Sequence, residues 1–228
     1  MKLRDRGAVD QVVVVDASGD GTGAIAARLG AEVHAQAGLM PSFGRVLGKG
    51  DAMWRSLSVL TGDVVCFVDA DTERFGPHFG CGLVGPLVVD PEAQFVKGFY
   101  RRPFRLGDEV APEGGGRVTE LTARPLLQLF YPQLAEIRQP LAGEIAARRS
   151  LLEQLPFATG YAVEIAMLID AYEFAGFDAI AQVDLDERQN RHQPLSELGP
   201  MATEVLRAVL DRSAIVERPP MASLRAAA

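Results

Sequence analysis

The chain has 228 residues, 48% of them hydrophobic, and a formal net charge of −7. This length suits one compact unit, so we expect a single domain over residues 1–218 and a flexible tail over 219–228. The negative charge argues against a general nucleic-acid binder, and no nucleic-acid partner is expected.

The start of the chain carries no targeting signal that we recognise. No apolar region of the kind found in signal peptides follows Met1-Lys2-Leu3-Arg4, and no apolar run reaches transmembrane length. The two cysteines, Cys66 and Cys81, are too few for a disulfide framework, and Cys66 is expected to be a buried thiol. We therefore expect a cytoplasmic protein without a membrane partner.

The first third of the chain alternates predicted strands and helices. Strands are predicted at 11–15, 32–34 and 64–68, and helices at 24–29 and 51–60. This alternation favours an α/β fold with an open, mainly parallel sheet flanked by helices. Ligands of such sheets bind beyond the carboxyl ends of the strands.

The remainder continues with a similar mixture and ends in helix. Strands are predicted at 95–100 and 180–185, and helices at 126–134, 151–155, 163–175 and 197–216, with a further helix beginning near 118 or 119. The fold therefore has a C-terminal helical segment.

Two carboxylates follow the strand predicted at 64–68, in the sequence Asp69-Ala70-Asp71. Because that strand is an unbroken apolar run, we expect it to be buried on both faces. Carboxylates at its end repel each other and lose hydration unless positive charge lies there. A divalent cation held between the carboxylates and a diphosphate supplies it. The alternative is a solvated turn.

A second acidic turn, D-x-S-x-D-G-T, follows the strand at 11–15. Ser18 and Asp20 are expected to cap the next helix. Asp16 stands at the strand end, where a carboxylate meets a base or ribose in folds of this kind.

A candidate cation, Lys49, lies between Gly48 and Gly50 on a turn into a helix. The segment is not a Walker motif, because its spacing is one residue short and Gly50 replaces the hydroxyl residue. Lys49 is either a contact for a phosphate or a solvated lysine.

A second anion site is indicated by Arg101-Arg102 at a strand end and by the glycine-rich segment 114–119 before a helix. Backbone N–H groups at a helix start, with a guanidinium and a hydroxyl nearby, suit a phosphate or carboxylate. The alternative is a flexible loop with surface arginines.

Two further polar features stand near apolar segments. Glu164 lies within an apolar helix, where its simplest partner is an arginine. The polar run Arg188-Gln189-Asn190-Arg191-His192 follows the strand at 180–185 and could close over a metal-bound diphosphate.

Several of these segments, taken together and in their order along the chain, resemble the glucosyl-3-phosphoglycerate synthases. These are a retaining GT-A (Rossmann-like) glycosyltransferase family with mannosyl-transferring relatives. The resemblance runs from about residue 12 to about residue 210 and is carried by Gly48-Lys49-Gly50, Phe67-Val68-Asp69-Ala70-Asp71, Phe99-Tyr100-Arg101-Arg102-Pro103, residues 114–121, Gln139-Pro140-Leu141 and Gly160-Tyr161. It implies a homodimer that transfers a hexose from UDP-glucose or GDP-mannose to the 2-hydroxyl of 3-phosphoglycerate, with Mg²⁺ or Mn²⁺.

The resemblance also implies a role for each candidate residue. Catalytic roles fall to Asp71, Glu164 and Arg188, and metal ligation falls to Asp71 and Asn190. Nucleotide-sugar contacts fall to Asp16, Ser18, Lys49, Asp69, Ala70, Leu141, Ala142 and Glu164. Acceptor contacts fall to Arg101, Gly116, Arg117, Val118, Thr119 and His192.

The chain departs from the family pattern in two places. Asn190 stands where the family has a metal-binding histidine, and an amide oxygen is a weaker, neutral ligand, although His192 could serve instead. The family pattern also begins with a strand and turn that hold the nucleotide base, and this chain begins after them. A misassigned start codon, a truncated chain and a strand supplied by a partner are the alternatives. Two hypotheses remain: an active hexosyltransferase, and a non-catalytic nucleotide-binding remnant.

Overall fold

The computed structural model describes residues 2–72, 75–101, 104–106, 109–111, 116–188 and 195–213. Its strands are β1 (Val13–Asp16), β2 (Glu32–Ala35), β3 (Val64–Phe67), β4 (Phe95–Arg101), β5 (Phe104–Leu106), β6 (Glu109–Ala111), β7 (Ile145–Arg148) and β8 (Ile180–Glu187). Its α-helices are α1 (Lys2–Asp5), α2 (Thr22–Arg28), α3 (Lys49–Ser56), α4 (Pro77–Val89), α5 (Arg124–Phe130), α6 (Arg149–Leu152), α7 (Val163–Ala175) and α8 (Leu195–Arg212).

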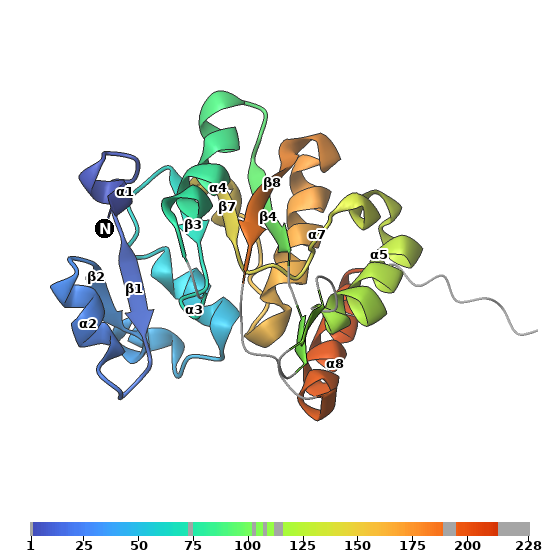
Figure 1. Cartoon of the computed structure of the whole chain (residues 1–228), viewed down its shortest axis with the longest axis horizontal. Coiled ribbons are helices and arrows are strands. Elements are labelled where there is room, and N and C mark those ends of the chain that lie inside the picture. The colour runs from blue at the N-terminus through green and yellow to red at the C-terminus, as the bar shows by residue number, and fades with distance from the viewer. Residues whose placement is uncertain are drawn as a thin grey trace, which may run out of the picture.

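The central sheet has four strands in the order β3-β7-β4-β8 (Figure 1). β7 is antiparallel to both β3 and β4, and β8 is parallel to β4. Therefore β3, β4 and β8 run in one direction and β7 alone is reversed, which confirms the prediction of a mainly parallel sheet. β5 and β6 form a separate antiparallel pair.

The two faces of the central sheet are covered by different helices. Side chains of a strand alternate between faces, so Phe95 packs in the core with α5, α7 and α8, while its neighbour Val96 packs with α4. Ile145 and Ala146 of β7 divide in the same way. The result is an α/β/α arrangement, which confirms the expected fold class and C-terminal helix.

β1 and β2 form their own parallel pair, with Val14 opposite Val33, and lie beside α2 at the left of Figure 1. Gln11 connects this β1–β2 unit to the segment before β3. Its amide nitrogen donates to the carbonyl of Val59 at 2.9 Å, and its amide oxygen accepts from the backbone N–H of Thr61 at 3.0 Å.

The expectation that the strand at 64–68 is buried on both faces was wrong, and the strand at 11–15 is likewise not fully buried. In β3 only Val65 is fully buried, and all four residues of β1 are half-buried. The reason is that each strand has one hydrogen-bonded neighbour within the described residues, β7 for β3 and β2 for β1, so each forms an edge.

Other predicted boundaries differ by a few residues. The helix expected at 51–60 begins at Lys49 and ends at Ser56, and the helix expected at 126–134 is α5 followed by a 3₁₀ turn, Pro132–Glu136. The predicted C-terminal helix extends to residue 216, and its part beyond residue 213 lies outside the described residues. The tail at 219–228 lies outside them entirely. Within the part of the chain that is described, every helix is too short or too polar to cross a bilayer.

Candidate functional site

The amine of Lys49 joins two acidic residues from distant elements. It contacts Asp69 Oδ1 at 2.5 Å and Glu164 Oε1 at 2.6 Å. Lys49 is the first residue of α3, Asp69 follows β3 and Glu164 lies in the first turn of α7. Lys49 is therefore an ion-paired residue rather than a solvated lysine, and the partner of Glu164 is this lysine rather than an arginine.

Arg188 approaches the same carboxylates from the end of β8. Its Nη2 donates to Asp69 Oδ2 at 3.1 Å and to Asp71 Oδ1 at 2.9 Å. Its Nη1 donates to the hydroxyl of Tyr100 at 2.8 Å and to Glu144 Oε2 at 3.0 Å. Only 2% of Arg188 is exposed. The sequence places it in a polar run, but in the fold it is a buried residue.

These two cations supply the positive charge that the paired carboxylates require. Burial alone would raise the pKa of Asp69, but Lys49 and Arg188 hold it below its usual value. Burial likewise lowers the pKa of Lys49, but Glu164 and Asp69 raise it above the usual value. Both groups therefore carry full charge at neutral pH.

The two aspartates differ in their access to solvent. The Asp69 side chain is 24% exposed and the Asp71 side chain is 74% exposed. The Asp69 carboxylate lies against Gly143, where an added Cβ would stand 2.4 Å from Oδ2. Asp69 is thus confined by the protein, whereas Asp71 presents an oxygen to solvent.

This pair of carboxylates suits a hard divalent cation. Mg²⁺ and Mn²⁺ prefer oxygen ligands and are commonly held by one or two carboxylates together with phosphate oxygens. Within the described residues there is no group of three His, Cys, Asp or Glu side chains that could hold a metal by itself. The chemistry of the donors fits a cation shared with a diphosphate. Asn190 and His192, the other predicted contacts, lie outside the described residues.

The Asp16–Thr22 turn is organised by its own side chains. Asp20 Oδ1 accepts hydrogen bonds from the Thr22 hydroxyl at 2.6 Å and the Ser18 hydroxyl at 2.7 Å, which lower its pKa to about 2. Asp16 accepts from the backbone N–H groups of Ser18 and Gly23. Ser18 therefore binds Asp20 and does not cap α2 itself, which corrects that expectation. Asp16 and Asp20 accept from the first amides of the helix.

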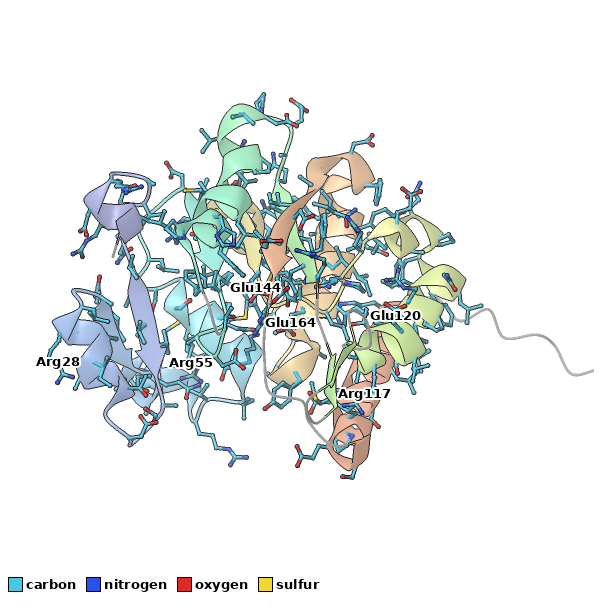
Figure 2. The ribbon with its side chains drawn as sticks, in the orientation of Figure 1. Arg28, Arg55, Arg117, Glu120, Glu144 and Glu164 are labelled. Carbon is cyan, nitrogen blue, oxygen red and sulfur yellow. The ribbon has the colours of Figure 1, made fainter. Side chains whose placement is uncertain are left out.

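The predicted acceptor residues lie on separate segments. Arg101 pairs with Asp186 at 2.6 Å, and both side chains are 72% exposed. Gly116 has a φ of 79°, and Thr119 is buried in the π-helical turn Thr119–Ala123. Figure 2 shows Arg117 below Glu144 and Glu164, beside α8. The role of this segment in binding the acceptor stays a prediction.

Ala142, one of the predicted nucleotide-sugar contacts, adjoins a lysine that was not predicted as a site residue. Ala142 is buried, and its carbonyl accepts a hydrogen bond at 2.6 Å from Nζ of the fully buried Lys97. Leu141 is half-buried and Ala70 is exposed. Burial is the main reason that the pKa of Lys97 falls to about 7.

Glu144, Lys97 and Tyr100 were missed as members of the site. Glu144 directly precedes the apolar strand β7, and Lys97 interrupts the apolar run of β4. A single charged residue inside or beside a buried strand needs a partner, and this signal could have found both.

Similarity to known proteins agrees with this geometry. No protein-family model matches the chain. The crystal structure of mannosyl-3-phosphoglycerate synthase from Rubrobacter xylanophilus superposes with a TM-score of 0.84 at 51% identity, over 92% of this chain and 66% of that one. That of glucosyl-3-phosphoglycerate synthase from Mycobacterium tuberculosis, in complex with Mn²⁺, UDP and glucosyl-3-phosphoglycerate, gives 0.82 at 45% identity, over 92% and 71%. The fold is therefore that of the GT-A glycosyltransferases.

Curated relatives identify the family within this class of glycosyltransferases. The glucosyl-3-phosphoglycerate synthase of Petrotoga mobilis is 49% identical over 90% of this chain and 63% of its own length, and that of Mycolicibacterium smegmatis is 45% identical over 92% and 69%. The chain belongs to the glucosyl-3-phosphoglycerate synthase family. It spans about two thirds of the length of the curated relatives that it matches.

Proposed function

We propose that this chain carries the catalytic centre of a metal-dependent, retaining hexosyltransferase that moves glucose from UDP-glucose to the 2-hydroxyl of 3-phosphoglycerate. The observation that carries the proposal is the cluster of Lys49, Asp69, Asp71, Glu164 and Arg188 at the carboxyl end of β3. Ligands of α/β sheets bind at such strand ends. The M. tuberculosis relative, which was solved with Mn²⁺, UDP and glucosyl-3-phosphoglycerate, supports the choice of substrates.

The donor nucleotide would lie between the two acidic turns. Asp16 and Ser18 follow β1 and would meet the base or ribose, while Asp69 and Ala70 follow β3 and would meet the ribose and sugar. Asp71 and Asn190 would hold Mg²⁺ or Mn²⁺, which when bound neutralises charge on the leaving diphosphate. Lys49 and Arg188 add fixed positive charge on the same side.

The sugar and the acceptor would lie on the side of α7 and the π-helical turn. Glu164, fixed by Lys49, would accept hydrogen bonds from hexose hydroxyls, and Leu141 and Ala142 would line the pocket. Gly116, Arg117, Val118 and Thr119, with Arg101 and His192, would hold the acceptor's phosphate and carboxylate. Holding both substrates in one orientation supplies much of the catalysis. Retention would follow if the acceptor attacks from the face that the diphosphate leaves.

Mannosyl transfer from GDP-mannose is a second candidate function. The R. xylanophilus enzyme, a mannosyl-3-phosphoglycerate synthase, is 51% identical to this chain. Both reactions would use the same cation and acceptor residues, and they differ in the base and in the configuration at the sugar 2-position.

The test is a transfer assay with the purified chain, 3-phosphoglycerate, Mn²⁺ and either UDP-glucose or GDP-mannose, with the product identified by mass spectrometry. We expect a product of hexose and phosphoglycerate that disappears without Mn²⁺ and in Asp71→Ala, which removes the exposed oxygen ligand. Asp211→Ala, an exposed aspartate of α8, is the matched control and should leave transfer unchanged.

The outcome with each sugar nucleotide decides between the candidates. Faster transfer from GDP-mannose would replace the glucosyl assignment. A folded chain that binds UDP and Mn²⁺ but transfers neither sugar would support the non-catalytic, nucleotide-binding remnant.

A further inference from the structure

Glu144 is a carboxylate that is entirely enclosed by the protein beneath the candidate site. Its exposed fraction is 0%, and it lies between Gly143 and β7. Its Oε1 is 2.8 Å and its Oε2 3.0 Å from the same atom, Nη1 of Arg188. Arg188 itself is 2% exposed. Breaking such a buried pair by removing one partner is strongly destabilising, because it leaves the other charge buried and uncompensated.

The surroundings of Glu144 are shaped to hold it there. A Cβ on Gly98 of β4 would stand 2.5 Å from Leu185 Cδ1 and 3.1 Å from the Glu144 Cβ, so the bare glycine makes room for both side chains. The Gly98 N–H donates to the Glu144 carbonyl at 2.9 Å. The Tyr100 hydroxyl, on the same strand, accepts from the Nη1 that contacts Glu144. Glu144 and Tyr100 therefore both bind Nη1 of the Arg188 guanidinium.

The other end of that guanidinium points to the paired aspartates. Nη2 of Arg188 contacts Asp69 at 3.1 Å and Asp71 at 2.9 Å. Because the guanidinium is planar and stiff, fixing Nη1 also fixes the position of Nη2. Glu144 has no exposed surface through which it could touch a substrate. It is linked to the two aspartates through a single residue, Arg188.

We infer that Glu144 is a positioning residue which, through Arg188, sets the charge and the spacing of Asp69 and Asp71. The inference rests on the proposed function, because it concerns the same cation and diphosphate site. With Glu144 in place, part of the arginine's charge is neutralised from below and its Nη1 is held away from the aspartates. Without that charge, the guanidinium would pair more strongly with Asp69 and Asp71 and would oppose a divalent cation at the same oxygens.

The experiment measures Mn²⁺ affinity directly, by electron paramagnetic resonance of free Mn²⁺ in the presence of UDP. Glu144→Gln keeps the shape of the side chain and removes its charge. We expect roughly tenfold weaker Mn²⁺ binding, as is typical when an outer partner of a metal site is lost. Glu153→Gln is the matched control, because Glu153 also pairs with an arginine, Arg149, but is 55% exposed. It should bind Mn²⁺ as the parent does.

A double-mutant cycle with Arg188→Met tests whether Glu144 acts through the arginine. In the Arg188→Met background we expect Glu144→Gln to change Mn²⁺ affinity by no more than about twofold, because the coupled partner is gone. If Glu144→Gln weakens binding equally in both backgrounds, the inference is overturned, since Glu144 would then act without Arg188.

Tyr100→Phe keeps the inference testable if Glu144→Gln does not fold. It removes only the hydroxyl that Arg188 contacts and should weaken Mn²⁺ binding in the same direction by a smaller factor, with unchanged KM for 3-phosphoglycerate and lower kcat. Folded variants with parental Mn²⁺ affinity would show that Glu144 and Tyr100 are structural only. Because Mn²⁺ binding is measured without turnover, these outcomes are distinguishable from a failure of sugar transfer.

Discussion

In the central sheet the candidate functional side chains are joined by ion pairs between distant residues, whereas in the β1–β2 unit they are joined by hydrogen bonds between near neighbours. Lys49 and Glu164 are 115 residues apart, and Asp69 and Arg188 are 119 apart. Ser18 and Asp20, by contrast, are two residues apart. The first arrangement exists only once the whole sheet has formed, and the second needs only the local turn.

The central sheet is also more deeply buried than the β1–β2 unit. Phe95 and Val96 of β4 are completely buried, while every residue of β1 is half-buried and, in α2, Gly23 alone is buried. Charge is therefore held in a low-dielectric setting at the end of β3 and in a solvated one at the end of β1. The difference suits the proposed division of the ligand, with the cation and diphosphate on the packed side and the base and ribose on the open side.

Substitutions at two glycines test the difference in packing between the two regions. A Cβ on Gly50 would stand 1.8 Å from the backbone oxygen of Ala158, which cannot turn away. We expect Gly50→Ala to lower the free energy of unfolding by about 3 kcal/mol, as for severe overpacking, and to displace the adjoining Lys49. Urea unfolding measures the change.

Gly23→Ala is the counterpart in the β1–β2 unit. Its Cβ would meet the Asp16 carboxylate at 2.5 Å, but that half-buried side chain lies at the strand end and can rotate. Alanine also favours a helix over glycine by about 1 kcal/mol, which offsets the lost hydrogen bond to Asp16. The net change should be within about 1 kcal/mol. Equal destabilisation by the two substitutions would contradict the contrast between a packed and an open region.

Lys97→Met should change how stability depends on pH. Burial lowers the Lys97 pKa to about 7 in the folded protein, while the unfolded chain keeps the usual value of about 10.4. Between these values the unfolded state binds more protons, so this lysine makes stability rise with pH, by roughly 1 kcal/mol per unit. The variant should lack that rise between about pH 7 and pH 9.

Four charged groups that face Lys97 also bear on how stability depends on pH. They are Glu164, Lys49, Glu144 and Asp69. The pKa of Lys49 is raised, so its contribution is lost only above its usual range, outside the window measured. Unfolding midpoints at several pH values give the slope. Parallel profiles for the parent and Lys97→Met would mean that Lys97 does not release its proton in this window.

The same contrast explains which parts of the fold could be predicted. Both ends of α7 were predicted correctly. Its apolar run stops at Gly176, whose φ of 83° suits glycine. β7 was not predicted, because Ile-Ala-Ala-Arg has little strand preference and becomes a strand only between β3 and β4. No helix was predicted at 77–89, where glycines suggest loops. Gly82 instead lets α4 approach Val183 and Leu185 of β8.

For the candidate site, single residues could be predicted but not their partners. The position of Asp69 and Asp71 after an apolar strand marks them, and the local turn around Asp16 follows from its own side chains. The ion pairs of Lys49 and Arg188 depend on where α3, α7 and β8 meet, which no local pattern contains. Glu144 could have been singled out beside its apolar strand, but its partner Arg188, 44 residues away, could not.

Arg117→Ala should act on the acceptor and leave the nucleotide sugar nearly unaffected. A charge-assisted contact to an anion contributes about 1.5–3 kcal/mol, so the KM for 3-phosphoglycerate should rise roughly tenfold or more. Arg207→Ala, an exposed arginine of α8, is the control. Steady-state kinetics with each substrate varied measures both. Loss of UDP-glucose affinity in Arg117→Ala would place this arginine at the donor instead.

Asn190→His is expected to give the smallest change and concerns residues outside those that the structure describes. If Asn190 occupies the position of the family's histidine, the variant should bind Mn²⁺ more tightly than the parent and in a more pH-dependent way. Imidazole must be neutral to ligate, and its unperturbed pKa is about 6.5. An amide does not titrate there. Mn²⁺ affinity measured between about pH 5.5 and pH 8 detects the difference.

The companion variant His192→Ala separates the two possible ligands of this segment. If His192 already supplies the ligand, its removal should weaken Mn²⁺ binding strongly, and Asn190→His should then do little, since the position is filled. If neither substitution changes the affinity at any pH, the segment does not reach the cation. The proposed metal site would then consist of Asp71 and the diphosphate, and its strength would depend all the more on how Arg188 is held beneath the two aspartates.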